Sequence, residues 1–249
     1  MEACSVTRCP DSLRRYLTES ARPLSSMVFV APLLLIYELG GSILGSSALR
    51  NGADTWLRNS LQSLGFKQHF LLPLLACAVL LSWHHVRRDQ WSLRPSVLPA
   101  MLTESLVFAF VLFSIAHLQH AFFAPRLSIP ADTSGAVDGS TLGRLIGYCG
   151  AGIYEELLFR LILLRAVAAT LFRVGVPSRA SLGWAVGATS LIFSAAHYQL
   201  FSAGGYLFDW YSFSFRFVAG IFFGLLFVFR GFGIAAGTHA FYDILVELL

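Results

Sequence analysis

Residues 213–249 read FSFRFVAGIFFGLLFVFRGFGIAAGTHAFYDILVELL, and this stretch decides the fold. It contains two apolar runs, 213–229 and 232–249, separated by an Arg-Gly turn. A helix needs about 20 mostly apolar residues to cross about 30 Å of hydrocarbon, so each run is predicted to span a membrane. The second run nevertheless carries His239 and Asp243. Because ionisable groups are costly in hydrocarbon, we expect a membrane protein with a polar site inside it.

The composition of the whole chain agrees with this expectation. Of its 249 residues, 56% are hydrophobic and 13% are charged, and the mean hydropathy is +0.66. Such a chain lacks the polar surface that a soluble domain of this length needs. The net charge of +4 would suggest nucleic acid as a partner in a soluble protein. Here the basic residues gather in loops beside apolar runs, where they anchor and orient a membrane protein, so no nucleic-acid partner is expected.

About seven spans are predicted in an all-α, polytopic helix bundle. They occupy residues 24–44, 66–86, 98–118, 142–172, 182–201, 213–229 and 232–249. The fourth is too long for a simple crossing and is expected to combine a membrane helix with an interfacial extension. Residues 1–23 are predicted to form a cytoplasmic tail. Residues 24–249 then make one transmembrane domain, and its chemically active core is residues 142–249.

The basic residues also predict the orientation, because short cytoplasmic loops carry the excess of Lys and Arg. With residues 1–23 inside, the arginine-bearing loops after the second, fourth and sixth spans also lie inside. One loop is an exception: it bears Arg50, Arg58 and Lys67 and falls on the opposite side. We predict a multi-pass protein of a bacterial inner membrane with a cytoplasmic N-terminus. The sequence leaves the oligomeric state open.

Three polar patterns lie in the fourth, fifth and seventh predicted spans. They are Glu155-Glu156-x-x-x-Arg160, Phe193-x-x-x-His197 and His239-x-x-x-Asp243. Residues four apart share one face of a helix, so Glu156 and Arg160 are expected to form an ion pair. Glu155 is then left as the free titratable carboxylate. Three helices of a bundle can present such acid-base groups to one buried pocket.

This set of groups suits hydrolysis inside a membrane. Glu155 and His197 would activate a water molecule, and His239 would donate toward the oxyanion of the tetrahedral intermediate. Phe193, one helical turn from His197, would exclude lipid or seat a substrate side chain. The zinc-protease pattern H-E-x-x-H does not occur in the sequence, so neither a metal nor another cofactor is expected.

The three patterns resemble those of the CPBP intramembrane proteases, which are the CAAX proteases and bacteriocin-processing enzymes, also called the Abi family. The family pattern is E-E-x-x-x-R, then F-x-x-x-H, then H-x-x-x-N or D, on successive membrane helices. The resemblance implies a metal-independent glutamic endopeptidase, similar to CAAX prenyl proteases, in which Glu155 and His197 activate water. His239 and Asp243 would form the oxyanion hole. CAAX-processing members carry Asn at the last position, whereas Asp243 donates a hydrogen bond only when protonated. Its alternative role is to orient His239.

The implied substrates are membrane-anchored or membrane-inserted proteins and peptides that enter the site from the lipid bilayer. Prenylated proteins, leader peptides and C-terminal sorting tails all fit. The predicted orientation puts the His197 end nearer the outer face, which favours exported substrates.

Two alternatives stay open. A thiol-type protease would use Cys149, which lies seven residues before Glu156 and therefore on the same helical face. A non-catalytic membrane scaffold or immunity protein would keep Glu156 and Arg160 as a purely structural buried ion pair.

Overall fold

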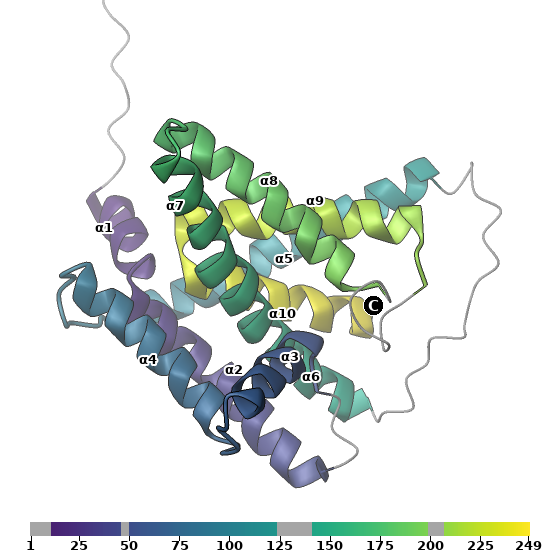
Figure 1. Ribbon diagram of the computed structural model, residues 1–249, viewed down its shortest axis with the longest axis horizontal. Helices are drawn as coiled ribbons and strands as arrows, with labels where there is room; N and C mark the ends of the chain where they lie inside the picture. Colours follow the sequence, from purple (N-terminus) through teal and green to yellow (C-terminus); the bar gives the residue numbers. More distant parts are fainter. Residues whose placement is uncertain (1–10, 46–49, 124–140, 199–206) are drawn as a thin grey trace, which may run out of the picture.

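The structure is a computed structural model that describes residues 11–45, 50–123, 141–198 and 207–249. Helices dominate this part of the chain (Figure 1). They are α1 (Asp11–Ser20), α2 (Pro23–Leu44), α3 (Gly52–Ser63), α4 (Leu71–Val86), α5 (Val97–Phe123), α6 (Thr141–Glu156), α7 (Arg165–Arg173), α8 (Ser178–Ala196), α9 (Trp210–Arg230) and α10 (Phe232–Leu248). A π-helical segment, Leu157–Leu164, joins α6 to α7. The predicted all-α class is confirmed.

Each predicted span overlaps a helix or the rod made of α6, the π-helical segment and α7. The last three residues of the fifth predicted span, 199–201, lie outside the described residues. Among the described helices, α2, α5 and α9 are long and apolar enough to cross a membrane, and α4 is a shorter apolar helix. The total of seven spans therefore stays a prediction. The fourth predicted span, 142–172, contains all of this rod except its two end residues, Thr141 and Arg173, and α7 occupies the part that was expected to be an extension.

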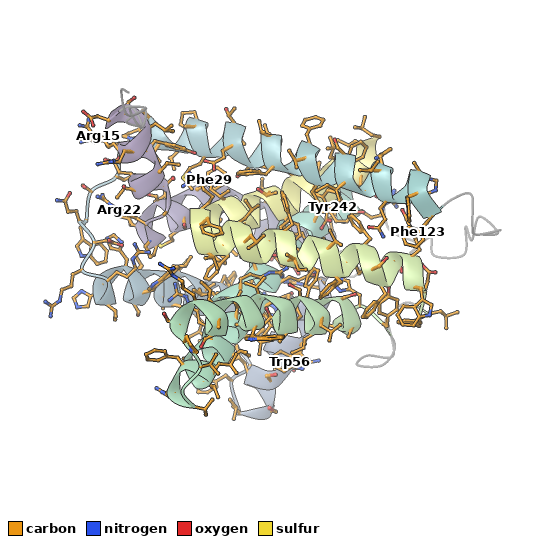
Figure 2. All side chains as sticks on the ribbon, turned by 90° about the horizontal axis from the view of Figure 1, so that it is seen from above. Arg15, Arg22, Phe29, Trp56, Phe123 and Tyr242 are labelled. Atoms are coloured by element: carbon orange, nitrogen blue, oxygen red, sulfur yellow. The ribbon has the colours of Figure 1, made fainter. Side chains whose placement is uncertain are left out.

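The surface of the bundle is that of an integral membrane protein. Large apolar side chains stay exposed along its outer helices: Ile43 on α2 is 83% exposed, Leu74 on α4 is 64% exposed and Leu118 on α5 is 72% exposed. Figure 2 shows such side chains pointing away from α5 along its length. Extended apolar surface of this kind marks contact with lipid or with partners rather than with water.

Two helices fall outside the predicted spans. Helix α1 lies in the predicted tail, 1–23, and its Tyr16 hydroxyl donates a hydrogen bond to Glu104 on α5, so residues 11–20 fold against the bundle. Helix α3 lies in the loop that was predicted after the first span. Asn51 begins it, because the Asn51 Oδ1 atom accepts a hydrogen bond from the Ala53 backbone N–H at 2.8 Å, the usual role of an N-cap residue.

Helix α10 lies at the centre of the bundle and packs against α5, α6, α9 and α2. Its first half is buried and rich in small residues, which lets neighbouring backbones approach closely. The contact with α6 is close. A Cβ atom added at Gly152 would lie 2.5 Å from the Ala236 carbonyl oxygen and 2.8 Å from the Ala240 Cβ atom. This approach brings the end of α6, with Glu155 and Glu156, beside His239.

The bundle has two chemically different ends. At the end that we call the arginine end, α1 meets the α4–α5 and α9–α10 connections: Arg230 donates to Glu104 Oε2 at 2.8 Å and to Ser20 Oγ at 2.9 Å. At the opposite end, which we call the pocket end, Gln119 on α5 donates to Ser214 on α9 at 2.9 Å. Figure 2 labels Arg15 and Arg22 at one end and Phe123 at the other.

Candidate active site

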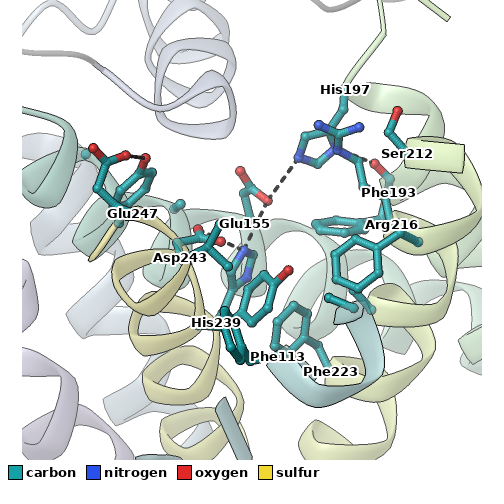
Figure 3. Close-up of a pocket in the computed structure, with 18 of the residues that line it drawn as sticks. Phe113, Glu155, Phe193, His197, Ser212, Arg216, Phe223, His239, Asp243 and Glu247 are labelled. Atoms are coloured by element: carbon teal, nitrogen blue, oxygen red, sulfur yellow. Dashed lines mark hydrogen bonds and ion pairs between the residues drawn. The ribbon is translucent and has the colours of Figure 1, made fainter. Parts of the chain in front are cut away.

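A cavity of about 1100 Å³ opens at the pocket end. Its walls come from α5, α6, α8, α9, α10 and the residues just before α3 (Figure 3). Five of the predicted site residues line it: Glu155, Phe193, His197, His239 and Asp243. The other two, Glu156 and Arg160, are buried behind this wall.

Glu155 lies between the two histidines. Its Oε2 atom is 3.7 Å from His197 Nε2 and 3.8 Å from His239 Nε2, and Figure 3 shows the carboxylate pointing toward both rings. Among the described residues, this oxygen has no hydrogen-bond partner. The structure thus brings together three side chains from α6, from the end of α8 and from α10.

The orientation of the His197 ring follows from its position at the end of α8. Its Nδ1 atom lies 2.8 Å from the Phe193 carbonyl oxygen. Since a carbonyl oxygen only accepts hydrogen bonds, Nδ1 carries a proton and donates it. In the neutral ring, Nε2 then has a free lone pair directed at Glu155, which is the arrangement a base requires.

The His239 ring is held on both edges and on one face. Its Nδ1 atom lies 2.8 Å from Glu156 Oε1, and its Nε2 atom lies 3.6 Å from Asp243 Oδ2. The Phe223 ring stacks on it, with centroids 4.4 Å apart and an interplanar angle of 12°. Because carboxylates accept hydrogen bonds, Nδ1 donates to Glu156 and Nε2 faces the cavity. Glu156 therefore orients the ring from behind, while Asp243 lies on the cavity side.

Arg160 supports this arrangement from inside the π-helical segment. Its Nη1 atom lies 3.1 Å from Glu156 Oε1, so the expected ion pair is formed, and Nη2 donates to the Gly220 carbonyl oxygen at 3.3 Å. Its guanidinium group also lies 4.3 Å from the centre of the Phe193 ring. A guanidinium over an aromatic face is favourable, more so away from water. Phe193 is 3% exposed, because it also packs against the rings of Phe159, His197 and His239.

Sequence reasoning missed Asn51, which donates a hydrogen bond from Nδ2 to Glu155 Oε1 at 2.7 Å. The sequence does carry one local signal, an Asn followed by Gly and Asp, which is typical of a helix start. That signal can predict α3 but not the partner of Asn51, because the two residues are 104 positions apart. Phe223 was missed for the same reason, since its partner His239 lies on another helix.

Cys149 lies apart from these groups. It is 5% exposed, its Sγ atom donates to the Leu145 carbonyl oxygen at 3.6 Å, and it is not part of the cavity wall. Among the residues that the structure describes, no group of three or more His, Cys, Asp or Glu side chains is arranged to hold a metal ion.

Residues 137–245 match the family described as type II CAAX prenyl endopeptidase Rce1-like. The match contains all three polar patterns, and it confirms the resemblance to CAAX proteases that those patterns predicted. The family is a family of proteases, which supports a protease of the CAAX type embedded in a membrane. The chain was also compared with curated proteins and with solved structures, and neither comparison gave a match.

Proposed function

We propose that this protein is a glutamic intramembrane endopeptidase, a proposal that the match of residues 137–245 to the Rce1-like family of CAAX endopeptidases supports. The observation that carries the proposal is the position of Glu155 Oε2, 3.7 Å from His197 Nε2 and 3.8 Å from His239 Nε2 at the wall of a large cavity. Groups this close together can all contact one water molecule or one carbonyl group that lies beside them in the cavity.

The proposed reaction begins with a water molecule in the cavity that contacts both Glu155 and His197. Glu155 takes a proton from the water molecule, and His197 Nε2 helps to orient that molecule. The oxygen of the water then attacks the peptide carbonyl. His239 donates from Nε2 to the oxyanion that forms. The proton on Glu155 then passes to the leaving amine, which closes the cycle. A positioned base typically contributes about 10²–10⁴-fold, and one oxyanion donor about 10²–10³-fold.

The remaining site residues hold this geometry in the proposal. Glu156 accepts the Nδ1–H of His239, so in the proposal the ring is an imidazolium, protonated on both nitrogens, and its Nε2–H is left for the oxyanion. Arg160 compensates the charge of Glu156. Asp243 faces His239 Nε2 at 3.6 Å, so it helps to orient the ring until substrate arrives. Phe193 packs between Arg160 and the cavity and forms part of the wall that a substrate side chain would meet.

The substrates that we propose are segments of exported or membrane-anchored proteins. The cavity opens at the pocket end, away from the arginine-rich α1. In the loop that is the exception to the predicted orientation, Arg58 pairs with Glu38 at 2.7 Å and with Asp54 at 2.6 Å. The orientation rule counts Lys and Arg near span ends rather than net charge, and more of them lie at the arginine end than at the pocket end. The arginine end is therefore proposed to be cytoplasmic, and the cavity to open on the other face.

The decisive experiment compares the membrane proteomes of cells that carry the intact protein, Glu155→Gln or Glu19→Gln, at equal amounts of inserted protein. Glu19 is a matched control because it lies at the arginine end, where it pairs with Arg94. We expect new protein termini with the intact protein and with Glu19→Gln, and none with Glu155→Gln. Termini that persist with Glu155→Gln would remove Glu155 from the reaction. Their absence from all three cultures would favour a scaffold or immunity protein.

The class of protease is tested on the purified protein with a peptide that spans one of these cleavage sites. Cys149→Ala is expected to retain cleavage, because the thiol donates to Leu145 and lies outside the cavity wall. Incubation with a metal chelator is also expected to leave the rate unchanged. Loss of cleavage in Cys149→Ala would support a thiol protease, and loss with the chelator that returns on adding zinc would support a metalloprotease.

A further inference from the structure

The carboxylate of Glu155 receives its hydrogen bond from outside the family-matched segment. Asn51 Nδ2 donates to Glu155 Oε1 at 2.7 Å, and in the described part of the chain no other hydrogen bond to this carboxylate is formed. Asn51 belongs to the connection between α2 and α3, whereas the family match begins at residue 137. The N-terminal half of the chain, which carries none of the three motifs, therefore contributes a side chain to the site.

The direction of the Asn51 amide is fixed by its two partners. Its Oδ1 atom accepts from the Ala53 backbone N–H at 2.8 Å as the N-cap of α3. Its NH₂ group must then face Glu155, and a carboxylate can only accept. Both ends of the amide are thus satisfied in one orientation, and the flipped amide would lose both hydrogen bonds.

A buried ionic cluster holds α3, and with it Asn51, in place. Glu38 on α2 accepts from Arg58 on α3 at 2.7 Å and from the Tyr154 hydroxyl on α6 at 2.6 Å. Tyr154 directly precedes Glu155 on α6, so the same cluster contacts α3, which Asn51 caps, and α6, which carries Glu155. Tyr37 on α2 adds a hydrogen bond to Asp54 Oδ2 at 2.8 Å.

We propose that Asn51 is a positioning residue that selects which oxygen of Glu155 faces the histidines. The terminal torsion of a Glu side chain is soft and roughly two-fold, so either oxygen could otherwise turn toward the cavity. With Oε1 held by Asn51, Oε2 is left directed at His197 and His239, 3.7 Å and 3.8 Å away. The inference rests on the proposed function, since it assigns Asn51 a role through the base of that reaction.

The test uses two substitutions that keep the helix cap. Asn51→Ser retains a good N-cap but is too short to reach Glu155, and Asn51→Asp retains the shape while replacing the donor with a carboxylate. The matched controls are Asn59→Ser and Asn59→Asp, because Asn59 lies on the same helix and is exposed. All four are assayed as full-length purified protein with the cleavage-site peptide.

We expect Asn51→Ser to lower kcat by about 10–100-fold, because small misplacements of a reacting group cost rates of this order, and to change KM by less than about twofold. The activity of Asn51→Asp, as a fraction of that of the intact protein, should rise as the pH falls. At lower pH the new Asp side chain and Glu155 share one proton, and the protonated Asp carboxyl group then donates a hydrogen bond to Glu155 as the Asn51 amide does. The Asn59 variants should match the intact protein. Equal kcat for Asn51→Ser and Asn59→Ser would overturn the inference.

An infrared measurement makes the test independent of catalysis. The carboxylate band of Glu155 is assigned by its loss in Glu155→Gln. We expect Asn51→Ser to shift this band and Asn59→Ser to leave it in place, because only the first removes a hydrogen bond from the carboxylate. A band that stays in place in Asn51→Ser refutes the contact itself. A shifted band in a protein that cleaves nothing would instead show that the hydrogen bond exists and that the proposed protease function fails.

Discussion

At the scale of single residues, the site depends on one buried cation. Arg160 is 2% exposed and lies 3.1 Å from Glu156, which is fully buried. Glu156 in turn orients His239 at 2.8 Å. A buried charge is tolerated when it is paired, and breaking such a pair by removing one partner typically costs about 3–5 kcal/mol. Arg160 thus links stability of the bundle to orientation of a proposed catalytic ring.

This link predicts different outcomes for stability and for cleavage. Arg160→Met should lower the free energy of unfolding by about 3–5 kcal/mol, because Glu156 is left as an uncompensated buried charge. Combining Arg160→Met with Glu156→Gln should recover part of the lost unfolding free energy, because the buried carboxylate of Glu156 is then also removed. Cleavage should stay low in the double variant, because a neutral amide holds the His239 proton less strongly than a carboxylate does.

The measurement is denaturant unfolding in detergent micelles, followed by tryptophan fluorescence, alongside the peptide cleavage assay. Arg88→Met is a suitable control, because Arg88 lies in the exposed α4–α5 connection and forms no ion pair within the described residues. If the double variant were no more stable than Arg160→Met alone, the buried charge would not be the source of the loss.

Residues that act within one helical turn were predictable, and residues that meet across the bundle were not. The spacing of Glu156 and Arg160 alone predicts their ion pair, because residues four apart share a helix face. The contact of Asn51 with Glu155 joins positions 104 apart, and no local periodicity encodes it. Phe193 lines the cavity, but most of its surface packs within the protein, so its expected role of excluding lipid or seating a substrate side chain stays a prediction.

At the scale of helices, the close approach of α6 and α10 sets the distance between the glutamates and His239. Gly152 lies one turn before Glu156 and faces Ala236 and Ala240. Small residues on both sides bring the two helix axes together, as they commonly do in membrane bundles. The distance between the glutamates and His239 therefore depends on small residues that take no part in the proposed chemistry.

Gly152→Ala is expected to separate the two helices and to reduce cleavage. The added Cβ atom would lie 2.5 Å from a backbone oxygen, which cannot move aside as a flexible side chain would. Overpacking of this kind typically costs about 1–3 kcal/mol, and the displaced α6 would carry Glu155 away from His239. We expect kcat to fall by about tenfold or more.

Gly187→Ala on α8 is the matched control, because a Cβ atom there would meet nothing within 4 Å. Alanine favours a helix over glycine by roughly 0.5–1 kcal/mol, so this variant should be as stable as the intact protein or slightly more stable, with unchanged cleavage. Unfolding curves and initial rates of both variants check the pair. Equal stability and equal cleavage rates for Gly152→Ala and Gly187→Ala would contradict the close packing of α6 against α10 at Gly152.

The apolar helices were predictable because their length and composition are set by the bilayer. The first predicted span, 24–44, differs from α2 by a single residue at its start. Helices α1 and α3 escaped prediction because they are short and carry polar residues, which resemble loop sequence when read along the chain. The π-helical segment after Glu156 also has no signature in apolar spacing. Such segments occur frequently at functional sites, and here it contains Arg160.

At the scale of the whole molecule, a group of arginines lies at the end opposite the cavity. The described arginines of α1 and of the connections that meet it are Arg14, Arg15, Arg22, Arg87, Arg88, Arg94 and Arg230. At the pocket end, Arg144 pairs with Glu247 at 2.7 Å, and Arg50 lies 3.3 Å from Asp54. The positive-inside rule counts basic residues near span ends, and this asymmetry is why we propose a cytoplasmic arginine end and a site that opens on the other face.

Cysteine labelling on intact cells tests this orientation without any assay of cleavage. In a protein whose four native cysteines are replaced by Ser, Thr141→Cys reports on the pocket end and Ser92→Cys on the arginine end, and both positions are exposed. We expect a membrane-impermeant maleimide to label Thr141→Cys in intact cells and Ser92→Cys only after the membrane is permeabilised. Labelling of both after permeabilisation shows that each thiol is reactive. The reverse pattern in intact cells would put the cavity on the cytoplasmic face, and the substrates would then be cytoplasmic segments of membrane-anchored proteins rather than exported ones.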